Sequence, residues 1–164
     1  MNQPTPAATA SRSNPKAVGE SLLKLLSSLQ SAADLTAEQV ERETGWTMQS
    51  SDHGTGYRAG AALTPDWGYS LSLSTPSGSD RKQLRFEFNR KNPDATATAI
   101  CDPDLERYAQ VLQSLGYQRS ALNAEHDRSL GWSFQRQGLW VRIYTRSESE
   151  DAFEHECVSL ITVE

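Results

Sequence analysis

Alternation of apolar and polar residues is the feature that most narrows what this chain can fold into. Side chains along a β-strand point alternately to its two faces, so every second residue of a half-buried strand is apolar. The pattern recurs in two strand pairs and a final strand: Tyr69, Leu71 and Leu73; Leu84, Phe86 and Phe88; Trp132 and Phe134; Leu139, Val141 and Ile143; Cys157, Ser159, Ile161 and Val163. It predicts antiparallel sheet with one face buried and the other in water.

Two helices are predicted before the first strands. Asn14 and Pro15 supply an N-cap followed by a first-turn proline, and an apolar stripe at helical spacing follows over 15–34. A second, short helix begins at Thr36, which forms a capping-box pattern with Gln39, and ends at Gly45. Residues 1–14 have almost no apolar side chain to bury and are predicted to form a disordered tail.

A third helix repeats the plan of the second. Asp102 is predicted to cap it, Pro103 to occupy its first turn and Gly116 to end it. Gly116 and Tyr117 match Gly45 and Trp46 at an offset of 71 positions. The stretch 138–145 matches 68–75 at an offset of 70, and its apolar positions keep their face.

We therefore predict an α+β fold made of two tandem helix-plus-antiparallel-sheet units, at 35–94 and 95–164, with an extra N-terminal helix at 15–34. Coincidence between two common α+β patterns is the alternative to a true duplication. A chain of 164 residues is long enough for one domain or for two small similar halves.

Charge and cysteine content exclude several classes of protein. The chain has 16 basic and 21 acidic residues and a net charge of -5, whereas nucleic-acid binders usually show a basic excess. No run of about 18 apolar residues is present, so no membrane span is predicted. Cys101 and Cys157 are too few for a disulfide framework, and the N-terminus does not look like a secretion signal. A cytoplasmic location with reduced thiols is the resulting expectation.

Three histidines each neighbour a carboxylate, as a general base or a metal site would need: Asp52-His53, His126-Asp127 and His155-Glu156. Adjacent residues on a strand point to opposite faces, so these pairs need not cooperate. A dyad of Cys157 and His155 is conceivable, but a buried structural cysteine is the more common case. No catalytic motif is present, and we expect no catalytic residue, no metal site and no cofactor.

One strand face carries the residues that favour partner binding. If Leu139, Val141 and Ile143 are buried, the opposite face of that strand presents Trp140, Arg142, Tyr144 and Arg146. Trp, Tyr and Arg are the types most enriched at binding hot spots. The alternative is that the N-terminal helix covers this face and makes its aromatic residues part of the core.

The segment that follows is strongly acidic and contains one apolar residue. We predict that it binds the same partner through Glu148, Glu150, Asp151, Phe153 and Glu154. An acidic loop of this kind can enter a basic cleft and steer association by complementary charge. A solvated loop without a partner is the simpler alternative.

The tandem helix-and-four-strand layout, the repeated Gly45-Trp46 and Gly116-Tyr117 pairs and the acidic loop at 148–156 resemble small bacterial inhibitor proteins. These include the β-lactamase inhibitor proteins, whose cysteine pair in each repeat this chain lacks, and the immunity proteins. The resemblance covers about residues 35–164. It implies a non-enzymatic inhibitor, of the kind of an immunity protein that occludes the active site of a cognate toxin.

Two other functions stay open from the sequence. The first is a dimeric secretion chaperone, in which the helix at Leu22–Leu29 would form the dimer seam. The second is an uncharacterised enzyme or metal-binding protein, which rests only on the histidine–carboxylate neighbours. The expected partner in the leading hypothesis is a protein, with no nucleic acid and no membrane, and the chain itself would be a monomer or a homodimer.

Overall fold

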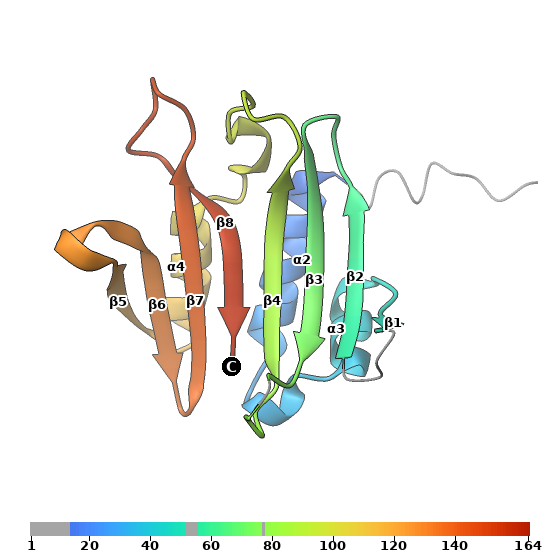
Figure 1. The fold of residues 1–164 in the computed structure, drawn as a ribbon. Coiled ribbons are helices and arrows are strands. Elements are labelled where there is room, and N and C mark those ends of the chain that lie inside the picture. The colour runs from blue at the N-terminus through green and yellow to red at the C-terminus, as the bar shows by residue number, and fades with distance from the viewer. Residues whose placement is uncertain (1–13, 52–55, 77) are drawn as a thin grey trace, which may run out of the picture.

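A single antiparallel sheet dominates the computed structural model, which describes residues 14–51, 56–76 and 78–164. Within these residues the sheet has eight strands in the order β1-β2-β3-β4-β8-β7-β6-β5 (Figure 1). The strands are β1 (Gln49–Ser50), β2 (Gly56–Ala62), β3 (Trp67–Ser74), β4 (Gln83–Arg90), β5 (Gln118–Asn123), β6 (Ser129–Arg136), β7 (Leu139–Ser147) and β8 (Glu156–Val163). The α+β class predicted from the sequence is confirmed.

Two meanders of neighbouring strands build this sheet. Strands β1 to β4 pair in sequence order, as do β5 to β8, and each set follows a helix. The last strands of the two sets pair antiparallel at the centre, where Leu84 lies opposite Val163 and Phe86 opposite Ile161. The two sets therefore form one continuous sheet.

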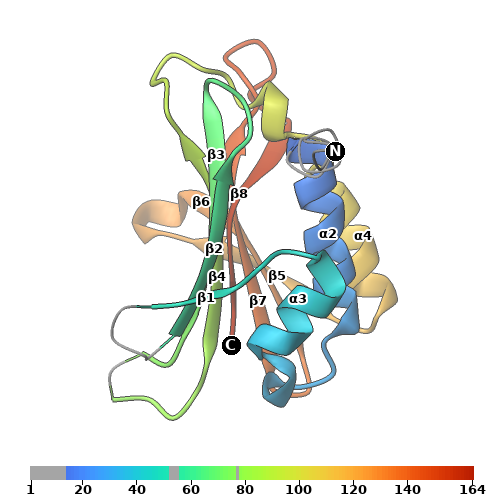
Figure 2. The same cartoon turned by 90° about the vertical axis from the view of Figure 1, so that its right-hand side faces the viewer.

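The helices cover one face of the sheet (Figure 2). They are α2 (Pro15–Ser28), α3 (Ala37–Thr44) and α4 (Leu105–Ser114), with short 3-10 turns at Ala32–Asp34, Thr98–Ile100 and Glu125–Asp127. The apolar stripe of α2 packs into the same core as the inward residues of the strands, among them Phe86, Phe134 and Val141, which are fully buried. None of the helices among the described residues is long and apolar enough to cross a membrane.

The first helix is shorter than predicted. It ends at Ser28 rather than at residue 34, and Leu29 is already extended. The hydroxyls of Ser27 and Ser28 donate to the carbonyls of Leu23 and Leu25, which competes with continuation of the helix. Ser31 and Asp34 then form a capping box around a separate 3-10 turn.

The ends of the predicted segments need two further corrections. Helix α4 begins at Leu105, two residues later than predicted, because the carboxylate of Asp104 rather than Asp102 accepts the hydrogen bond from the amide of Arg107. The prediction that Asn14 belongs to the tail 1–14 is wrong, but its predicted role as the N-cap of the first helix is confirmed, because it accepts a hydrogen bond from the amide of Ala17. The remainder of the predicted tail, 1–13, lies outside the described residues.

Candidate functional site

The face of the sheet opposite the helices carries three of the predicted binding residues. Leu139, Val141 and Ile143 are fully buried in the core beneath the helices, so the alternate residues of β7 point the other way. Those residues are Trp140, Arg142 and Tyr144, and each is half-buried. The alternative that the N-terminal helix covers them is wrong, because α2 packs on the opposite face.

Two of these side chains are held in place by the end of the chain. The guanidinium of Arg142 donates to the carboxylate of Glu164 at 2.8 Å and lies 5.1 Å from the centre of the Trp140 ring. The backbones of Trp140 and Glu164 also exchange hydrogen bonds in both directions. A binding group fixed in this way loses little conformational entropy on association.

Neighbouring strands extend this surface. Leu160 on β8 lies opposite Tyr144, and Thr162 lies opposite Arg142 on one side and Arg85 of β4 on the other. We call Trp140, Arg142, Tyr144 and Leu160 the open-face patch, and Thr162 is buried beside them. The patch combines aromatic and aliphatic surface with an arginine, as the centre of a protein interface does.

Arg146 does not belong to the open-face patch. Arg146 lies beyond the irregularity between Tyr144 and Thr145, where β8 has the extra residue Ser159, and it pairs with Cys157 near the end of the sheet. Its guanidinium lies 5.5 Å from the ring centre of the buried Trp67. Burial, followed by the charge of Arg90, lowers the pKa of Arg146, and Glu87 partly opposes this.

The acidic loop forms one wall of a hollow of about 730 Å³ at that end of the sheet. From the predicted set, this hollow is lined by Arg146, Glu148, Glu150, Asp151 and Phe153. Phe153 is 67% exposed, and Glu154 is also exposed on the same loop. The structure thus divides the predicted binding residues between the open face and this hollow instead of joining them in one surface.

Glu148 is not a free acid of the loop, since its carboxylate lies 2.6 Å from Nδ1 of His155. The other ring nitrogen, Nε2, lies 2.8 Å from Asp104, whose second carboxylate oxygen caps α4. Both hydrogen bonds need a protonated ring, and those to Glu148 and then Asp104 raise the pKa of His155. The bonds from His155 and then Thr98 lower the pKa of Glu148.

This cluster was missed by sequence reasoning. The sequence neighbour Glu156 is not the partner of His155; it accepts hydrogen bonds from Trp132 and Thr145. Asp104 is 51 positions from His155 in the chain, and no local pattern links the two. His126 lies in a turn with a positive φ of 61°, and the pair Asp52-His53 lies outside the described residues.

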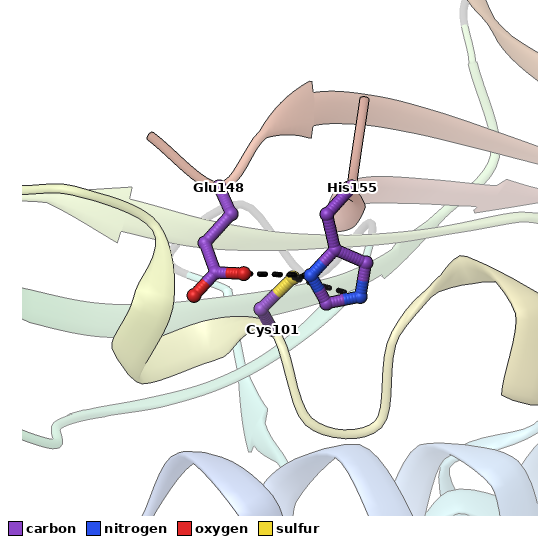
Figure 3. Close-up of side chains that lie close together, drawn as sticks. All are labelled: Cys101, Glu148 and His155. Atoms are coloured by element: carbon purple, nitrogen blue, oxygen red, sulfur yellow. Dashed lines mark hydrogen bonds and ion pairs between the residues drawn. The ribbon is translucent and has the colours of Figure 1, made fainter. Parts of the chain in front are cut away.

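The expectation that both cysteines are reduced thiols is wrong for this structure. Cys101 and Cys157 form a disulfide, so a catalytic dyad of Cys157 and His155 is also wrong for this form of the protein. The bond links the turn before α4 to β8. Cys101 lies beside Glu148 and His155 (Figure 3). Sγ of Cys101 lies 3.6 Å from Nδ1 of His155.

Three ligand types meet at this point. One ligand atom each from Cys101, Glu148 and His155 lies within 4.8 Å of the other two. A disulfide sulfur lacks the thiolate charge that metal ions bind, so in the oxidised form this cluster offers only the imidazole and the carboxylates.

No family model, curated protein or solved structure matches this chain.

Proposed function

We propose that this protein is a non-enzymatic inhibitor of the immunity type, which binds a cognate toxin and blocks the toxin's active site. The observation that carries the proposal is the open-face patch, an aromatic and arginine surface on a sheet whose other face is covered by helices. Trp140, Arg142 and Tyr144 are the proposed anchors. They need no chemistry of their own, because steric occlusion is sufficient to inhibit an enzyme.

The geometry of the anchors supports this role. Arg142 is bonded to Glu164 and stacked near Trp140, so both side chains are ordered before a partner arrives. Hot-spot residues are typically Trp, Tyr and Arg near the centre of an interface, surrounded by contacts that exclude water. Leu160 on β8 provides part of such surroundings.

The acidic loop is proposed as a second contact. It extends beyond the end of the sheet between β7 and β8 (Figure 1) and exposes Glu150, Asp151, Phe153 and Glu154. Its charge complements a basic cleft, and Phe153 adds apolar contact at the tip. Because the loop and the open-face patch lie at different places on the sheet, a partner that touches both must curve around its end.

We further propose that the scaffold arose by duplication of a helix-plus-four-strand unit. The two units have the same order of elements, and β3 and β7, which the 70-residue offset aligns, are the third strands of their meanders.

The cellular compartment is also part of the proposal. Disulfides persist in oxidising surroundings, so the bond between Cys101 and Cys157 favours an extracytoplasmic site of action over the cytoplasmic one.

The helix surface that the chaperone alternative needs for dimer contact is buried within the chain itself. Leu22, Leu25, Leu26 and Leu29 are at most 1% exposed and lie in the core of their own chain. Light scattering on the purified protein tests the remaining possibility. A monomer that forms a one-to-one complex with its partner supports inhibition, and a stable dimer supports the chaperone.

Matched baits test the main proposal. The oxidised chain and two double variants, Trp140→Ala/Tyr144→Ala and Ser70→Ala/Ser74→Ala, are used to capture partners from the native cells. We expect one stoichiometric partner with wild type and the serine variant, and its loss with the aromatic variant. The partner's activity, measured with and without each bait, must then be inhibited in the same order. A partner retained by the aromatic variant, or one whose activity is unchanged, contradicts the proposal.

A further inference from the structure

The cluster around His155 has the composition of a transition-metal site once its disulfide is opened. We propose that reduction of the Cys101–Cys157 disulfide creates a zinc site formed by the cysteine thiolates, His155 and Glu148. The inference is independent of the proposed inhibitor function. It concerns the helix side of the sheet, away from the open-face patch.

The identity of the ligands selects the metal. Thiolate, imidazole and carboxylate are the three ligand types of protein zinc sites, whereas calcium and magnesium require oxygen ligands. Cys101, Cys157, His155 and Glu148 offer one donor atom each, and four donors complete a tetrahedral site. Soft thiolates further favour zinc over the harder divalent cations.

One distance between ligand atoms already matches that of a zinc site, whereas the two sulfur atoms separate only when the disulfide is reduced. With bonds of about 2.0 Å to nitrogen and about 2.3 Å to sulfur, neighbouring tetrahedral ligands lie about 3.3–3.7 Å apart. Sγ of Cys101 and Nδ1 of His155 are 3.6 Å apart. The hydrogen bond of 2.6 Å between Glu148 and His155 has to lengthen, and both groups are on the partly exposed side, where such movement is allowed. Cys101 and Cys157 form the buried floor.

Asp104 would orient the histidine without binding the metal. It lies 2.8 Å from Nε2 of His155, which leaves Nδ1 facing Glu148 and Cys101 (Figure 3). A carboxylate on the second ring nitrogen is the usual support of a zinc-bound histidine. Asp104 is itself fixed as the N-cap of α4, so the support is rigid.

The chemistry requires a reductant, for which a phosphine is suitable. The phosphine supplies two electrons and takes an oxygen atom from water to become the phosphine oxide. The S–S bond breaks, and each sulfur takes up one of the two protons of that water and becomes a thiol. Zinc then replaces the thiol protons, which are released to solvent. The same two segments, the turn before α4 and the start of β8, are thus linked by a covalent bond when oxidised and by a metal ion when reduced.

The test measures zinc in the full chain before and after reduction. The protein is reduced with a phosphine under argon, incubated with zinc, desalted and analysed for metal content, and circular dichroism follows its fold. We expect one zinc ion per reduced chain and none above background in the oxidised chain. Cobalt in place of zinc should give the thiolate charge-transfer absorption and the visible bands of a tetrahedral site.

Variants separate this site from adventitious binding. The reduced variant His155→Ala should bind no more zinc than the double variant Cys101→Ser/Cys157→Ser. The control variant His126→Ala should still bind one zinc ion per chain. Asp104→Ser keeps a good helix cap but cannot reach His155, so zinc affinity should weaken by about 10- to 100-fold. Melting curves of the oxidised variants show that each one folds.

Three results would overturn the proposal. The first is a reduced wild type that binds no more zinc than the double cysteine variant. The second is His155→Ala with full zinc content, since the two cysteines alone would then explain binding. The third is a reduced chain that unfolds and is not refolded by zinc.

Discussion

Strands β3 and β7 occupy the same place in the two halves of the sheet, and their buried faces are alike while their open faces differ. Each is the third strand of its meander. Inward residues are apolar in both: Tyr69, Leu71 and Leu73 against Leu139, Val141 and Ile143, all in one core. Outward residues are small in one and large in the other: Ser70, Ser72 and Ser74 against Trp140, Arg142 and Tyr144.

Folding explains the inward residues of these two strands but not the difference between their outward residues. Inward side chains must fill a close-packed core, which keeps both strands apolar. Outward side chains lie on the face that none of the described helices covers, so packing against the helices does not dictate them. Packing against the helices therefore does not explain the large side chains on the outward face of β7, which are the anchors of the proposed inhibitor. The second half also differs in carrying the disulfide partner Cys157 and the histidine cluster.

The largest expected effect concerns that disulfide. Cys101→Ala/Cys157→Ala should lower the free energy of unfolding of the oxidised protein by about 2–4 kcal/mol, because the bond closes a loop of 56 positions and restricts the unfolded chain. Denaturant unfolding at equilibrium measures the loss. The matched variant His155→Ala keeps the bond and removes only half-exposed ion pairs, so its loss should be below about 1 kcal/mol. Equal losses in the two variants would show that the covalent link adds nothing.

The next effect tests the difference between the open faces directly. Trp140→Ala should weaken binding of the captured partner by at least about 2 kcal/mol, the usual threshold of a hot spot. Ser70→Ala, the aligned position in β3, should change it by less than about 0.5 kcal/mol, as expected of a surface substitution. Calorimetric titration with the purified partner measures both. Similar values for the two variants would remove the open face of β7 from the interface.

Much of the fold was predictable because it rests on local chemistry. Alternation located β3, β4, β6, β7 and β8, since a half-buried strand must place apolar residues on one face. The helix limits were less predictable where two signals compete. Asp102 and Asp104 are both good caps, and the sequence pattern does not say which carboxylate reaches the amide of Arg107.

The candidate site was predictable only where it follows a strand. The positions of Trp140, Arg142 and Tyr144 follow from alternation. The irregularity between β7 and β8 after Tyr144, which no residue type announces, leaves Arg146 beyond the part of β7 that carries the open-face patch. The cluster of Asp104, Glu148 and His155 and the pairing of two distant cysteines depend on the order of strands in the sheet. That order places β8 at the centre of the sheet, between β4 and β7, and no pattern within one segment of the sequence predicts it.

The smallest effect tests whether the two halves remain equivalent where function does not separate them. Gly45, after α3, has a positive φ of 76°, and a Cβ added there would meet no atom within 4 Å. Gly116, after α4, has a positive φ of 94°, and a Cβ added there would meet only the Arg136 side chain, at 3.7 Å. Since space is not limiting, Gly45→Ala and Gly116→Ala should each destabilise the protein by about 1 kcal/mol through backbone strain alone. Asparagine tolerates this conformation better, so Gly45→Asn and Gly116→Asn should each lose less. Thermal or denaturant unfolding compares the four variants. A large loss at one glycine and none at the other would show that the two helix ends, like the outward faces of β3 and β7, are not equivalent.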